Sequence, residues 1–351
     1  MSSVPNPVNF KPQFPATYHP GIGIIGCGEI VQIAHLPAYK KYGVNVVGAY
    51  DISSQATQAV HDTFGVRIFS SVDELLAHPE IEVVDIATHP AARVELVRKA
   101  LRAGKHVLSQ KPFALDIPTA QLLIAEARDC GRKLAVNQNG RWAPAWRVAT
   151  LLVEQGMVSD VLAITHLYEI SFEQFVHTPF DAIPHFGIYD YSVHWLDITR
   201  CWMGETPVQA IRAREYRTPN QPVESKANWG MWIEIAYENG ASAFIRGVNC
   251  LETPAKGHSF WIHGRQGSIH GRVEDLVEIE RGGTTTNYQL EGRWFPDGFA
   301  GTMGELLSAI AEEREPYNSA QHNLLSLQMT LAACRSSEED SRAVSLEEVL
   351  K

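Results

Sequence analysis

A short glycine-containing loop near the start of the chain has the composition of a phosphate-binding turn. The loop reads Gly26-Cys27-Gly28-Glu29-Ile30-Val31 and directly follows an apolar run that predicts a strand. Gly26 suits a tight turn, and Gly28 lets the backbone approach a pyrophosphate at the N-terminus of the next helix, where free N–H groups favour anions. The residues expected to bind a dinucleotide are Gly26, Cys27, Gly28, Glu29 and Ile30.

The register of this loop is chosen by its position between a strand and a helix. A literal G-x-G-x-x-G match exists at Gly21, Gly23 and Gly26, but it lies inside the predicted strand and follows only a proline-rich arm. The functional motif has to follow a strand and open a helix, so we reject that match. In the accepted register Val31 occupies the third glycine position, and its bulk predicts a helix displaced from the strand or rotated.

An acidic residue at the end of the next predicted strand supports the same interpretation. Asp51 follows Val31 by 20 residues, where a carboxylate accepts hydrogen bonds from the adenosine ribose. It also repels a 2′-phosphate, because two unit charges about 4 Å apart at an effective dielectric near 20 interact with up to about 4 kcal/mol. The spacing therefore favours NAD over NADP. The alternative is that Asp51 only caps the following helix.

A lysine follows a later strand, at the edge of the sheet where ligands bind. In an open α/β sheet, ligands occupy the crevice at the carboxyl ends of the strands. The strand predicted at residues 107–109 is followed by Gln110-Lys111-Pro112, which places Lys111 at that edge. Thr88, after the strand predicted at residues 83–87, is also assigned to the cofactor site. The alternative for Lys111 is a solvated surface charge.

Two separated motifs resemble one known family. The run Gly104-Lys105-His106-Val107-Leu108-Ser109-Gln110-Lys111-Pro112 resembles the Gly-Lys-His-Val-x-x-Glu-Lys-Pro segment of the Gfo/Idh/MocA oxidoreductases, which are sugar and polyol dehydrogenases. The segment from Asp190 to His194 is similar to the family's Asp-x-x-x-His motif. The resemblance runs from about Gly21 to the C-terminus and includes Arg314-Glu315-Pro316.

The resemblance implies that Lys111, Asp190 and His194 converge at the nicotinamide as catalytic residues. A neutral imidazole at His194 can accept a hydroxyl proton, and a carboxylate at Asp190 would orient it if residues 189–203 are helical and the two share a face. Lys111 would donate to the substrate oxygen and stabilise the developing alkoxide. The alternative for His194 is an ordinary core histidine.

Gln110 departs from the glutamate that is usual in the family and that is thought to contact the nicotinamide ribose. A glutamine still donates and accepts hydrogen bonds, but it brings no charge, so cofactor affinity could differ. Gln110 is nevertheless assigned to the cofactor site together with Lys111. The resemblance also predicts a cis peptide bond between Lys111 and Pro112.

The segment from Tyr168 to Trp202 is rich in aromatic residues, with His177 and His185 among them. The apolar faces of sugars pack on aromatic rings, so this segment suits a carbohydrate pocket, although a core or an oligomer interface is the alternative. The residues assigned to the substrate site are His185, Tyr168, Trp195 and Asn139. No metal is expected, because the chain lacks a His-Glu-x-x-His motif and paired cysteines.

The order of predicted elements indicates an α/β protein with two domains. Alternating strands and helices predict a doubly wound parallel Rossmann sheet at residues 21–142, after an extended proline-rich arm at residues 1–20. Residues 143–351 should form an α+β domain with an open, mainly antiparallel sheet, including a hairpin at Glu238-Asn239-Gly240. This domain is expected to bind substrate and to form a homo-oligomer, a dimer or a tetramer, and its C-terminal helices could pack on the first domain.

Composition excludes several functional classes. The 351 residues are 45% hydrophobic and 20% charged, and their formal charge of −10 argues against nucleic acid as a partner. No apolar stretch is long enough to span a membrane and no leader is apparent, so a cytoplasmic location without membrane association is expected. The scattered cysteines are expected to be reduced thiols: Cys27, Cys130, Cys201, Cys250 and Cys334.

Three functions are compatible with these residues. The first is NAD(P)-dependent oxidation of a secondary alcohol in a sugar, polyol or related cyclic substrate. The second is a redox-neutral sugar enzyme, in which NAD oxidises and later reduces the substrate during glycoside cleavage or epimerisation. The third is a sensor without catalytic activity. The presence of Lys111, Asp190 and His194 argues against the sensor.

Overall fold

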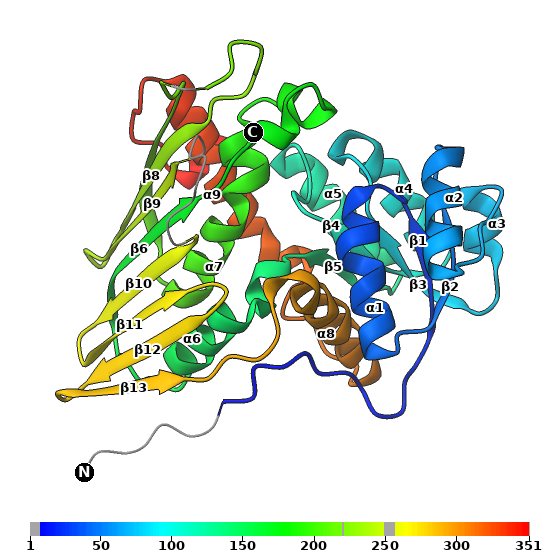
Figure 1. Ribbon diagram of the computed structural model, residues 1–351, viewed down its shortest axis with the longest axis horizontal. Helices are drawn as coiled ribbons and strands as arrows, with labels where there is room; N and C mark the ends of the chain where they lie inside the picture. The colour runs from blue at the N-terminus through cyan, green and yellow to red at the C-terminus, as the bar shows by residue number, and fades with distance from the viewer. Residues whose placement is uncertain (1–7, 220, 249–256, 351) are drawn as a thin grey trace. The chain divides into compact units, whose positions relative to one another are not determined.

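The computed structural model describes residues 8–219, 221–248 and 257–350, and Cys250 lies outside them. The chain divides into two compact units. We call residues 11–142 and 293–324 the Rossmann unit. We call residues 8–10, 143–292 and 325–350 the sheet unit. Figure 1 labels most of the helices and strands of the two units.

The Rossmann unit contains a five-stranded sheet in the order β2-β1-β3-β4-β5, and all of its strand pairs are parallel. The strands are β1 (Gly21–Ile25), β2 (Val46–Tyr50), β3 (Ile81–Ile86), β4 (His106–Gln110) and β5 (Leu134–Asn137). All but the edge strand β2 are buried along nearly their whole length, as expected for a sheet covered on both faces. The predicted doubly wound parallel sheet is confirmed.

Helices connect these strands, and several of them begin at residues whose side chains cap them. Ser53 and Asp116 accept hydrogen bonds from the first turns of α2 and α5, and Gly104 and Gly131 take left-handed conformations just after helices end. The short helix α3 was not predicted from the sequence. The elements are η1 (Val31–His35), α1 (Leu36–Tyr42), α2 (Ser54–Phe64), α3 (Val72–Ala77), α4 (Pro90–Arg102), α5 (Ile117–Asp129), η2 (Asn139–Trp142), η6 (Trp294–Gly298) and α8 (Phe299–Ala311).

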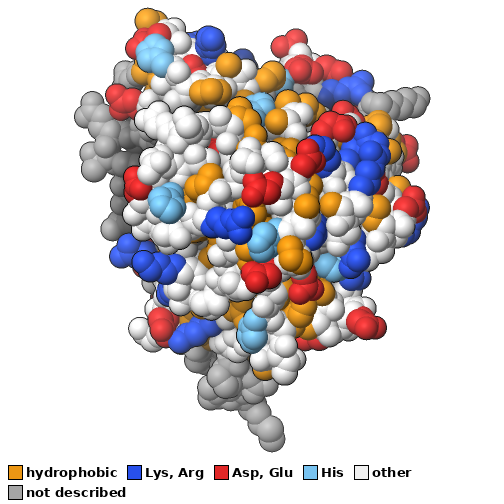
Figure 2. All heavy atoms as spheres, turned by 90° about the vertical axis from the view of Figure 1, so that its right-hand side faces the viewer, with side chains coloured by type: hydrophobic (Ala, Val, Ile, Leu, Met, Phe, Trp, Pro, Cys, Tyr) orange, Lys and Arg blue, Asp and Glu red, His pale blue; other side chains and the backbone are white. Residues whose placement is uncertain are grey.

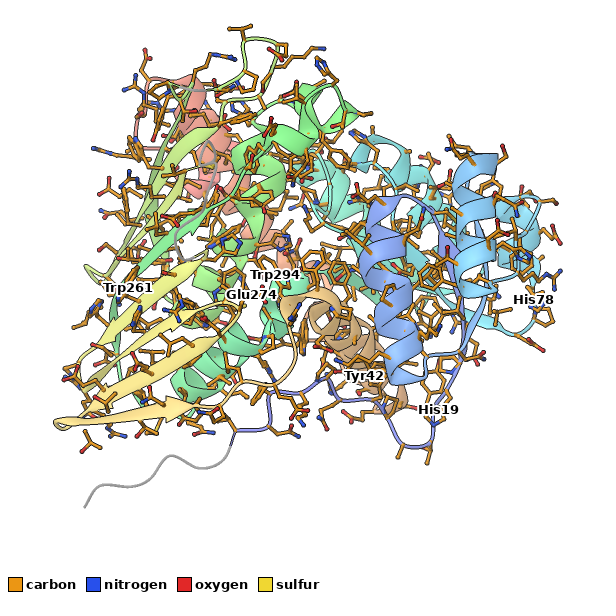
Figure 3. All side chains as sticks on the ribbon, in the orientation of Figure 1. His19, Tyr42, His78, Trp261, Glu274 and Trp294 are labelled. Carbon is orange, nitrogen blue, oxygen red and sulfur yellow. The ribbon has the colours of Figure 1, made fainter. Side chains whose placement is uncertain are left out.

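Residues 11–20, the described part of the proline-rich arm in this unit, contain neither helix nor strand. The arm packs on its own unit: Phe14 stacks on Tyr42, which is labelled in Figure 3, with ring centroids 5.7 Å apart. A Cβ atom added at Gly304 of α8 would lie only 2.1 Å from the carbonyl oxygen of Gln13. Glycine at this position therefore allows the arm to approach the helix.

The sheet unit contains an eight-stranded sheet in the order β13-β12-β11-β10-β6-β9-β8-β7. The pair β6 and β9 is parallel and the other pairs are antiparallel, which confirms the predicted open, mainly antiparallel sheet. Gly240, with φ of +85°, makes the predicted turn between β8 and β9. The strands are β6 (Val161–Glu169), β7 (Val208–Tyr216), β8 (Gly230–Tyr237), β9 (Ser242–Val248), β10 (Ser259–Gly264), β11 (Gly267–Arg272), β12 (Leu276–Arg281) and β13 (Thr284–Tyr288).

The two faces of this sheet differ in their side chains. One face is buried and contacts helices, including α6 (Pro144–Glu154) and α7 (Val193–Met203). On the other face, cross-strand registers align Phe244, Thr165, Trp261 and His270 in one row. Trp261, labelled in Figure 3, stacks on His270 with ring centroids 4.9 Å apart, and Phe244 is 40% exposed. This second face carries a partly exposed aromatic row.

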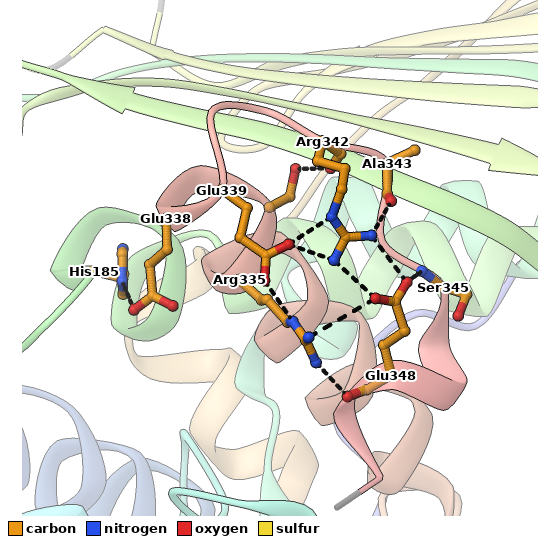
Figure 4. A network of polar contacts seen from close by, with 9 residues as sticks. His185, Arg335, Glu338, Glu339, Arg342, Ala343, Ser345 and Glu348 are labelled. Carbon is orange, nitrogen blue, oxygen red and sulfur yellow. Dashed lines mark hydrogen bonds and ion pairs between the residues drawn. The ribbon is translucent and has the colours of Figure 1, made fainter.

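Ion pairs join the end of α9 (Ala320–Glu338) to the segment that follows it (Figure 4). Arg342 pairs with Glu339 and Glu348, and Arg335 pairs with the same two carboxylates. These side chains are roughly one third to two fifths exposed, so solvent screens each pair and its contribution to stability is small. The network fixes the last short turn, η7 (Leu346–Val349), on the helix end.

The surface carries charges of both signs. Figure 2 shows acidic and basic side chains interspersed on the face that it presents. Within residues 8–219, 221–248 and 257–350, no helix is long and apolar enough to cross a membrane. Over the same ranges, no group of three or more His, Cys, Asp or Glu side chains could hold a metal ion.

Candidate active site

The glycine loop after β1 has the shape that a phosphate requires. Gly26 has φ of +105°, and a Cβ atom there would lie 2.5 Å from the carbonyl oxygen of Ala87, so only glycine fits. A Cβ atom added at Gly28 would meet no atom within 4 Å, which leaves open space beside the backbone. The loop therefore combines a strained turn with an unobstructed N-terminal helix end, as pyrophosphate binding needs. Gly21 and Gly23 lie within β1, as the chosen register requires.

The helix that follows this loop starts with a π-helical turn. Val31, at the third glycine position, is fully buried and begins η1, which continues into α1 at Leu36. The helix expected after the loop is therefore present from Glu29 to Tyr42, with a π-turn inserted near its start. The bulkier Val31 is accommodated where the helix is wider than an α-helix, and this turn ends at His35.

Asp51 holds the glycine loop through its carboxylate. Its Oδ2 accepts a hydrogen bond from the backbone N–H of Cys27 at 2.6 Å, and its Oδ1 accepts one from Ser53 at 2.8 Å. The cap of α2 is Ser53, not Asp51, so the capping alternative is wrong. A carboxylate has further lone pairs, which remain suited to ribose hydroxyls.

The thiol of Cys27 is inert. Burial, with a further contribution from the Asp51 carboxylate, raises the pKa of Cys27 to about 12. The buried side chain of Cys27 therefore adds no negative charge to the loop.

The backbone around Lys111 is held from both sides. The peptide bond between Lys111 and Pro112 is cis, as predicted. The backbone N–H of Lys111 donates to Oε1 of Gln110 at 2.8 Å. Arg93 of α4, which is 2% exposed, donates to the carbonyl oxygens of Thr88, Gln110 and Pro112. One buried guanidinium thus ties together the loops after β3 and β4. Sequence analysis did not identify Arg93, because nothing in an amphipathic helix pattern distinguishes a buried arginine from an exposed one.

Two polar side chains at the strand ends have unused hydrogen-bonding capacity. Oγ1 of Thr88, after β3, is buried and has no partner among the described residues. The same holds for both amide atoms of Gln138, which is 1% exposed and follows β5. The register pairs Gln110 with Asn137, so Gln138 follows β5 as Lys111 follows β4. Gln138 was not among the residues predicted to bind the cofactor, although its position directly after a strand could have identified it.

Asn139 is engaged within the Rossmann unit. Its Oδ1 accepts a hydrogen bond from Nε1 of Trp294 at 2.7 Å, and its Nδ2 donates to the carbonyl oxygen of Asn137 at 3.2 Å. The side chain is 1% exposed. These contacts favour a supporting role for Asn139, the residue that sequence analysis had assigned to substrate.

The Rossmann unit therefore fits a bound NAD. The cradle at Gly26, the open backbone at Gly28 and the orphaned hydroxyl of Thr88 all lie at the carboxyl ends of parallel strands. Asp51 lies at the end of the adjacent strand, β2, and its negative charge disfavours a 2′-phosphate.

In the sheet unit, Asp190 and His194 lie on two different helical segments. Asp190 belongs to the π-turn η5 (Phe186–Tyr191), and His194 lies in the first turn of α7. The condition under which the two residues would share a face, one helix over residues 189–203, is therefore not met at its start. The wider turn is closed by a hydrogen bond from the N–H of Ser192 to the carbonyl of Gly187 at 2.8 Å. Asp190 and His194 are each 8% exposed.

This π-turn is fixed to the sheet by two contacts. A Cβ atom added at Gly187 would lie 2.1 Å from the methyl group of Met231 on β8, so glycine allows the close approach. Glu215 of β7 accepts a hydrogen bond from the N–H of Ile188 at 3.3 Å. The position of Asp190 is therefore set by strands that lie far from it in sequence.

His185 precedes this turn and is held by two carboxylates. Its Nδ1 lies 2.6 Å from Glu215 and its Nε2 lies 2.9 Å from Glu338. The hydrogen bond with Glu215 is the main reason that the pKa of His185 rises to about 9. A substrate hydroxyl at His185 would have to replace one of these contacts, so they favour a structural role.

Tyr168 and Trp195, the aromatic residues assigned to substrate, lie in the core of the sheet unit. Both are 0% exposed, and their rings stack with centroids 4.1 Å apart. The Tyr168 hydroxyl lies 2.8 Å from the hydroxyl of Ser192. Ser192 stands between Asp190 and His194 in the sequence. These two rings support the segment that carries the predicted catalytic pair.

These features define a dinucleotide-binding oxidoreductase with a second, sheet-containing unit. The chain belongs to the Gfo/Idh/MocA oxidoreductase family. Residues 21–138 match the family's NAD-binding Rossmann fold, and residues 152–346 match its C-terminal alpha/beta domain. The resemblance described from the sequence is confirmed.

Several curated relatives have names of sugar and polyol enzymes. A D-apiose dehydrogenase from Paraburkholderia graminis is 30% identical over 52% of this chain, and the match spans about half (49%) of that relative's length. An inositol 2-dehydrogenase from Rhizobium meliloti is 22% identical over 90% of this chain and 96% of the relative. An oxidoreductase from Agrobacterium radiobacter, solved in complex with NAD+, L-tartaric acid and magnesium, matches 94% of this chain and 99% of its own, with a TM-score of 0.84 and 22% identity. This last likeness establishes the fold.

Proposed function

We propose that this protein is an NAD-dependent dehydrogenase acting on a secondary alcohol of a sugar, polyol or related cyclic substrate. One observation carries the proposal. The Gly26 loop, Asp51 and Lys111 follow three strands of one parallel sheet, at the edge where such sheets bind ligands. Relatives named apiose dehydrogenase, 1,5-anhydro-D-fructose reductase and inositol dehydrogenase support the substrate class.

The cofactor is held by the Rossmann unit. In the loop from Gly26 to Ile30, the N–H groups of Gly26 and Cys27 already bond to Tyr50 and Asp51, so those of Gly28, Glu29 and Ile30 bind the pyrophosphate. Asp51 accepts hydrogen bonds from the adenosine ribose. Gln110 uses one N–H and one lone pair within the protein, so its amide keeps a second N–H for the nicotinamide ribose. Thr88 supplies a hydroxyl from the end of β3. Bound NAD supplies the hydride acceptor.

Three side chains carry the proton and charge changes. His194 accepts the proton of the substrate hydroxyl, and Asp190 orients its ring and stabilises the imidazolium that forms. Lys111 donates a hydrogen bond to the same oxygen and stabilises negative charge developing on it. The backbone that carries the Lys111 side chain is held in place. Gln110 accepts a hydrogen bond from the N–H of Lys111, and Arg93 donates one to the carbonyl oxygen of Pro112.

The quaternary structure and location belong to the same proposal. The aromatic row formed by Phe244, Thr165, Trp261 and His270 is suited to self-association, because an antiparallel sheet can bury its second face against another copy. The described cysteines Cys27, Cys130, Cys201 and Cys334 are free thiols, which supports the reducing cytoplasm.

Replacement of Lys111 tests the proposed chemistry. Lys111→Met removes the cation and keeps most of the side-chain volume, so NADH formation with an active sugar or polyol is expected to fall by about a hundredfold or more. NAD binding, measured by calorimetry, should change little because the pyrophosphate and adenosine contacts remain. Lys40→Met, at an exposed position of α1, is the matched control.

The same assay distinguishes the alternatives. A sugar and polyol panel that yields product without accumulating NADH would indicate the redox-neutral enzyme. Ligand binding without any turnover would indicate a sensor. Full activity of Lys111→Met would refute the proposed role of this lysine.

A further inference from the structure

Gln110 has an amide whose orientation is fixed by its neighbours. The backbone N–H of Lys111 can only donate a hydrogen bond, so the atom 2.8 Å from it has to be the amide oxygen, Oε1. The amide nitrogen then faces the opposite way, toward Nε2 of His35 at 3.2 Å. Gln110 therefore connects the backbone at Lys111 to a histidine from the π-turn η1.

His35 is neutral in this arrangement. The amide nitrogen of Gln110 can only donate, so Nε2 of His35 has to be the acceptor and carries no proton. The proton is on Nδ1, which donates to Oδ2 of Asp85 at 2.6 Å. Asp85 lies on β3, and both side chains are 0% exposed.

The other groups around His35 stabilise this tautomer. Tyr39 of α1 donates its hydroxyl to the same oxygen of Asp85 at 2.6 Å. Burial, with a contribution from Asp85, raises the pKa of Tyr39 well above its ordinary value, so Tyr39 stays a donor. From α8, the ring of Phe299 lies 4.8 Å from the His35 ring, centroid to centroid, and offers no charge. Protonated Nε2 would meet the N–H of Gln110, two donors facing each other.

We propose that His35 is a positioning residue that acts through Gln110 on Lys111. Asp85 and Tyr39 fix the neutral ring, the ring fixes the amide, and the amide holds the backbone N–H that precedes the Lys111 side chain. This inference rests on the proposed function of Lys111. The hydrogen-bond direction within the relay does not depend on that function.

The relay also explains how glutamine replaces the glutamate usual in the family. A glutamate at position 110 would present only acceptors, so His35 would have to carry protons on both nitrogens and become an imidazolium. Asp85, His35 and residue 110 together carry one negative charge in either case. Glutamine with a neutral histidine and glutamate with an imidazolium are therefore equivalent in charge, and the histidine proton compensates the substitution.

The protonation state of His35 is measured directly by ring ¹⁵N NMR on the full-length protein, free and with NAD. The His35 signals are assigned by their loss in His35→Gln. We expect wild-type His35 to be neutral at neutral pH, with its proton on Nδ1, as the hydrogen bonds with Asp85 and Gln110 require. In Gln110→Glu the same ring should be an imidazolium at neutral pH. A wild-type imidazolium, a proton on Nε2, or a Gln110→Glu ring that stays neutral would each overturn the relay.

Kinetics and binding test the effect on Lys111. His35→Leu removes the acceptor and should lower kcat by about tenfold or more, because a small displacement of a catalytic group is costly, while the Kd for NAD changes less than about twofold. His35→Gln keeps a carbonyl acceptor and should recover part of kcat. Equal kcat values for wild type and His35→Leu, or for His35→Leu and His35→Gln, would contradict the positioning role.

The two proposals fail in different ways. If Lys111→Met stays active while the NMR result holds, the proposed function of Lys111 is wrong and the relay stands as a structural feature. If Lys111→Met is inactive but the His35 tautomer is not the expected one, the relay alone is wrong. His61→Gln is the control, because His61 lies on α2 and its ring nitrogen contacts only the carbonyl of Val66.

Discussion

Asp51 stabilises the glycine loop through hydrogen bonds from the protein backbone. Its two oxygens each accept a backbone N–H, one from the loop at Cys27 and one from Ser53 ahead of α2. The residue that disfavours a 2′-phosphate is thus also the residue that holds the phosphate-binding turn. An uncharged substitute affects both tasks at once, because an amide has only one acceptor oxygen.

Asp51→Asn is expected to change cofactor preference. The amide removes the charge that repels a 2′-phosphate, so the ratio of NAD to NADP affinity should fall by about tenfold or more. Affinity for NAD should also decrease, because the amide nitrogen faces one of the two backbone N–H donors. Calorimetric titration with both cofactors measures these changes. Asp62→Asn on the exposed side of α2 is the control, and an unchanged ratio in Asp51→Asn would contradict the electrostatic explanation.

At the scale of elements, π-turns carry two of the residues that matter most. His35 ends η1 and Asp190 lies in η5, and each turn precedes an α-helix. A π-turn adds a residue relative to an α-turn, so it shifts the following side chains around the helix axis. Glu215 of β7 links η5 to the sheet, because it forms hydrogen bonds with His185 and with the N–H of Ile188.

The contact between His185 and Glu215 predicts a pH-dependent stability. The pKa of His185 is raised to about 9, so its stabilisation is complete below the ordinary histidine pKa and is lost as the pH rises through about 9. We expect the free energy of unfolding to fall by about 1 to 2 kcal/mol between about pH 6.5 and 9, after allowing for solvent at Glu338. Urea unfolding of wild type and His185→Gln at several pH values measures this term. The same pH dependence in both proteins would argue against it.

At the scale of the whole molecule, the partly exposed face of the eight-stranded sheet is the surface best suited to bind another protein chain. Its central row pairs aromatic residues across strands, while charged residues such as Glu234 and Glu278 lie opposite the ends of the row. An apolar centre with a polar rim is the usual anatomy of a protein interface. A second copy of this chain, with the same row, would cover it.

Trp261→Arg should dissociate the proposed oligomer. Burying an unpaired arginine at the centre of an interface is costly, so light scattering should give the mass of one chain, 39.0 kDa, where the wild type gives a multiple of it. Leu122→Arg, at an exposed apolar position of α5, should leave the mass unchanged. A wild type that already has the mass of one chain would disprove self-association through this face.

Local patterns predicted much of the fold and part of the site. The strands of the Rossmann sheet, the β8–β9 hairpin with its turn at Gly240, most helices and the dinucleotide loop follow from periodicity and glycine positions, because these act over a few residues. The π-turns, Arg93 and the His35 relay were not predicted. Each depends on a partner from another element: Thr88 and Gln110 for Arg93, and Asp85 for His35.

The sequence by itself determined the family, the cofactor class and the position of Lys111 directly after a strand, because these depend on residue type and spacing along the chain. Only the tertiary structure decided which polar groups are already engaged. The side chains of Asn139 and His185 have hydrogen-bond partners within the protein, whereas the amide atoms of Gln138 have none among the described residues. Gln110 is oriented by a neutral His35. Hydrogen-bond partners are set by burial and by contacts between distant segments, and a linear pattern contains neither.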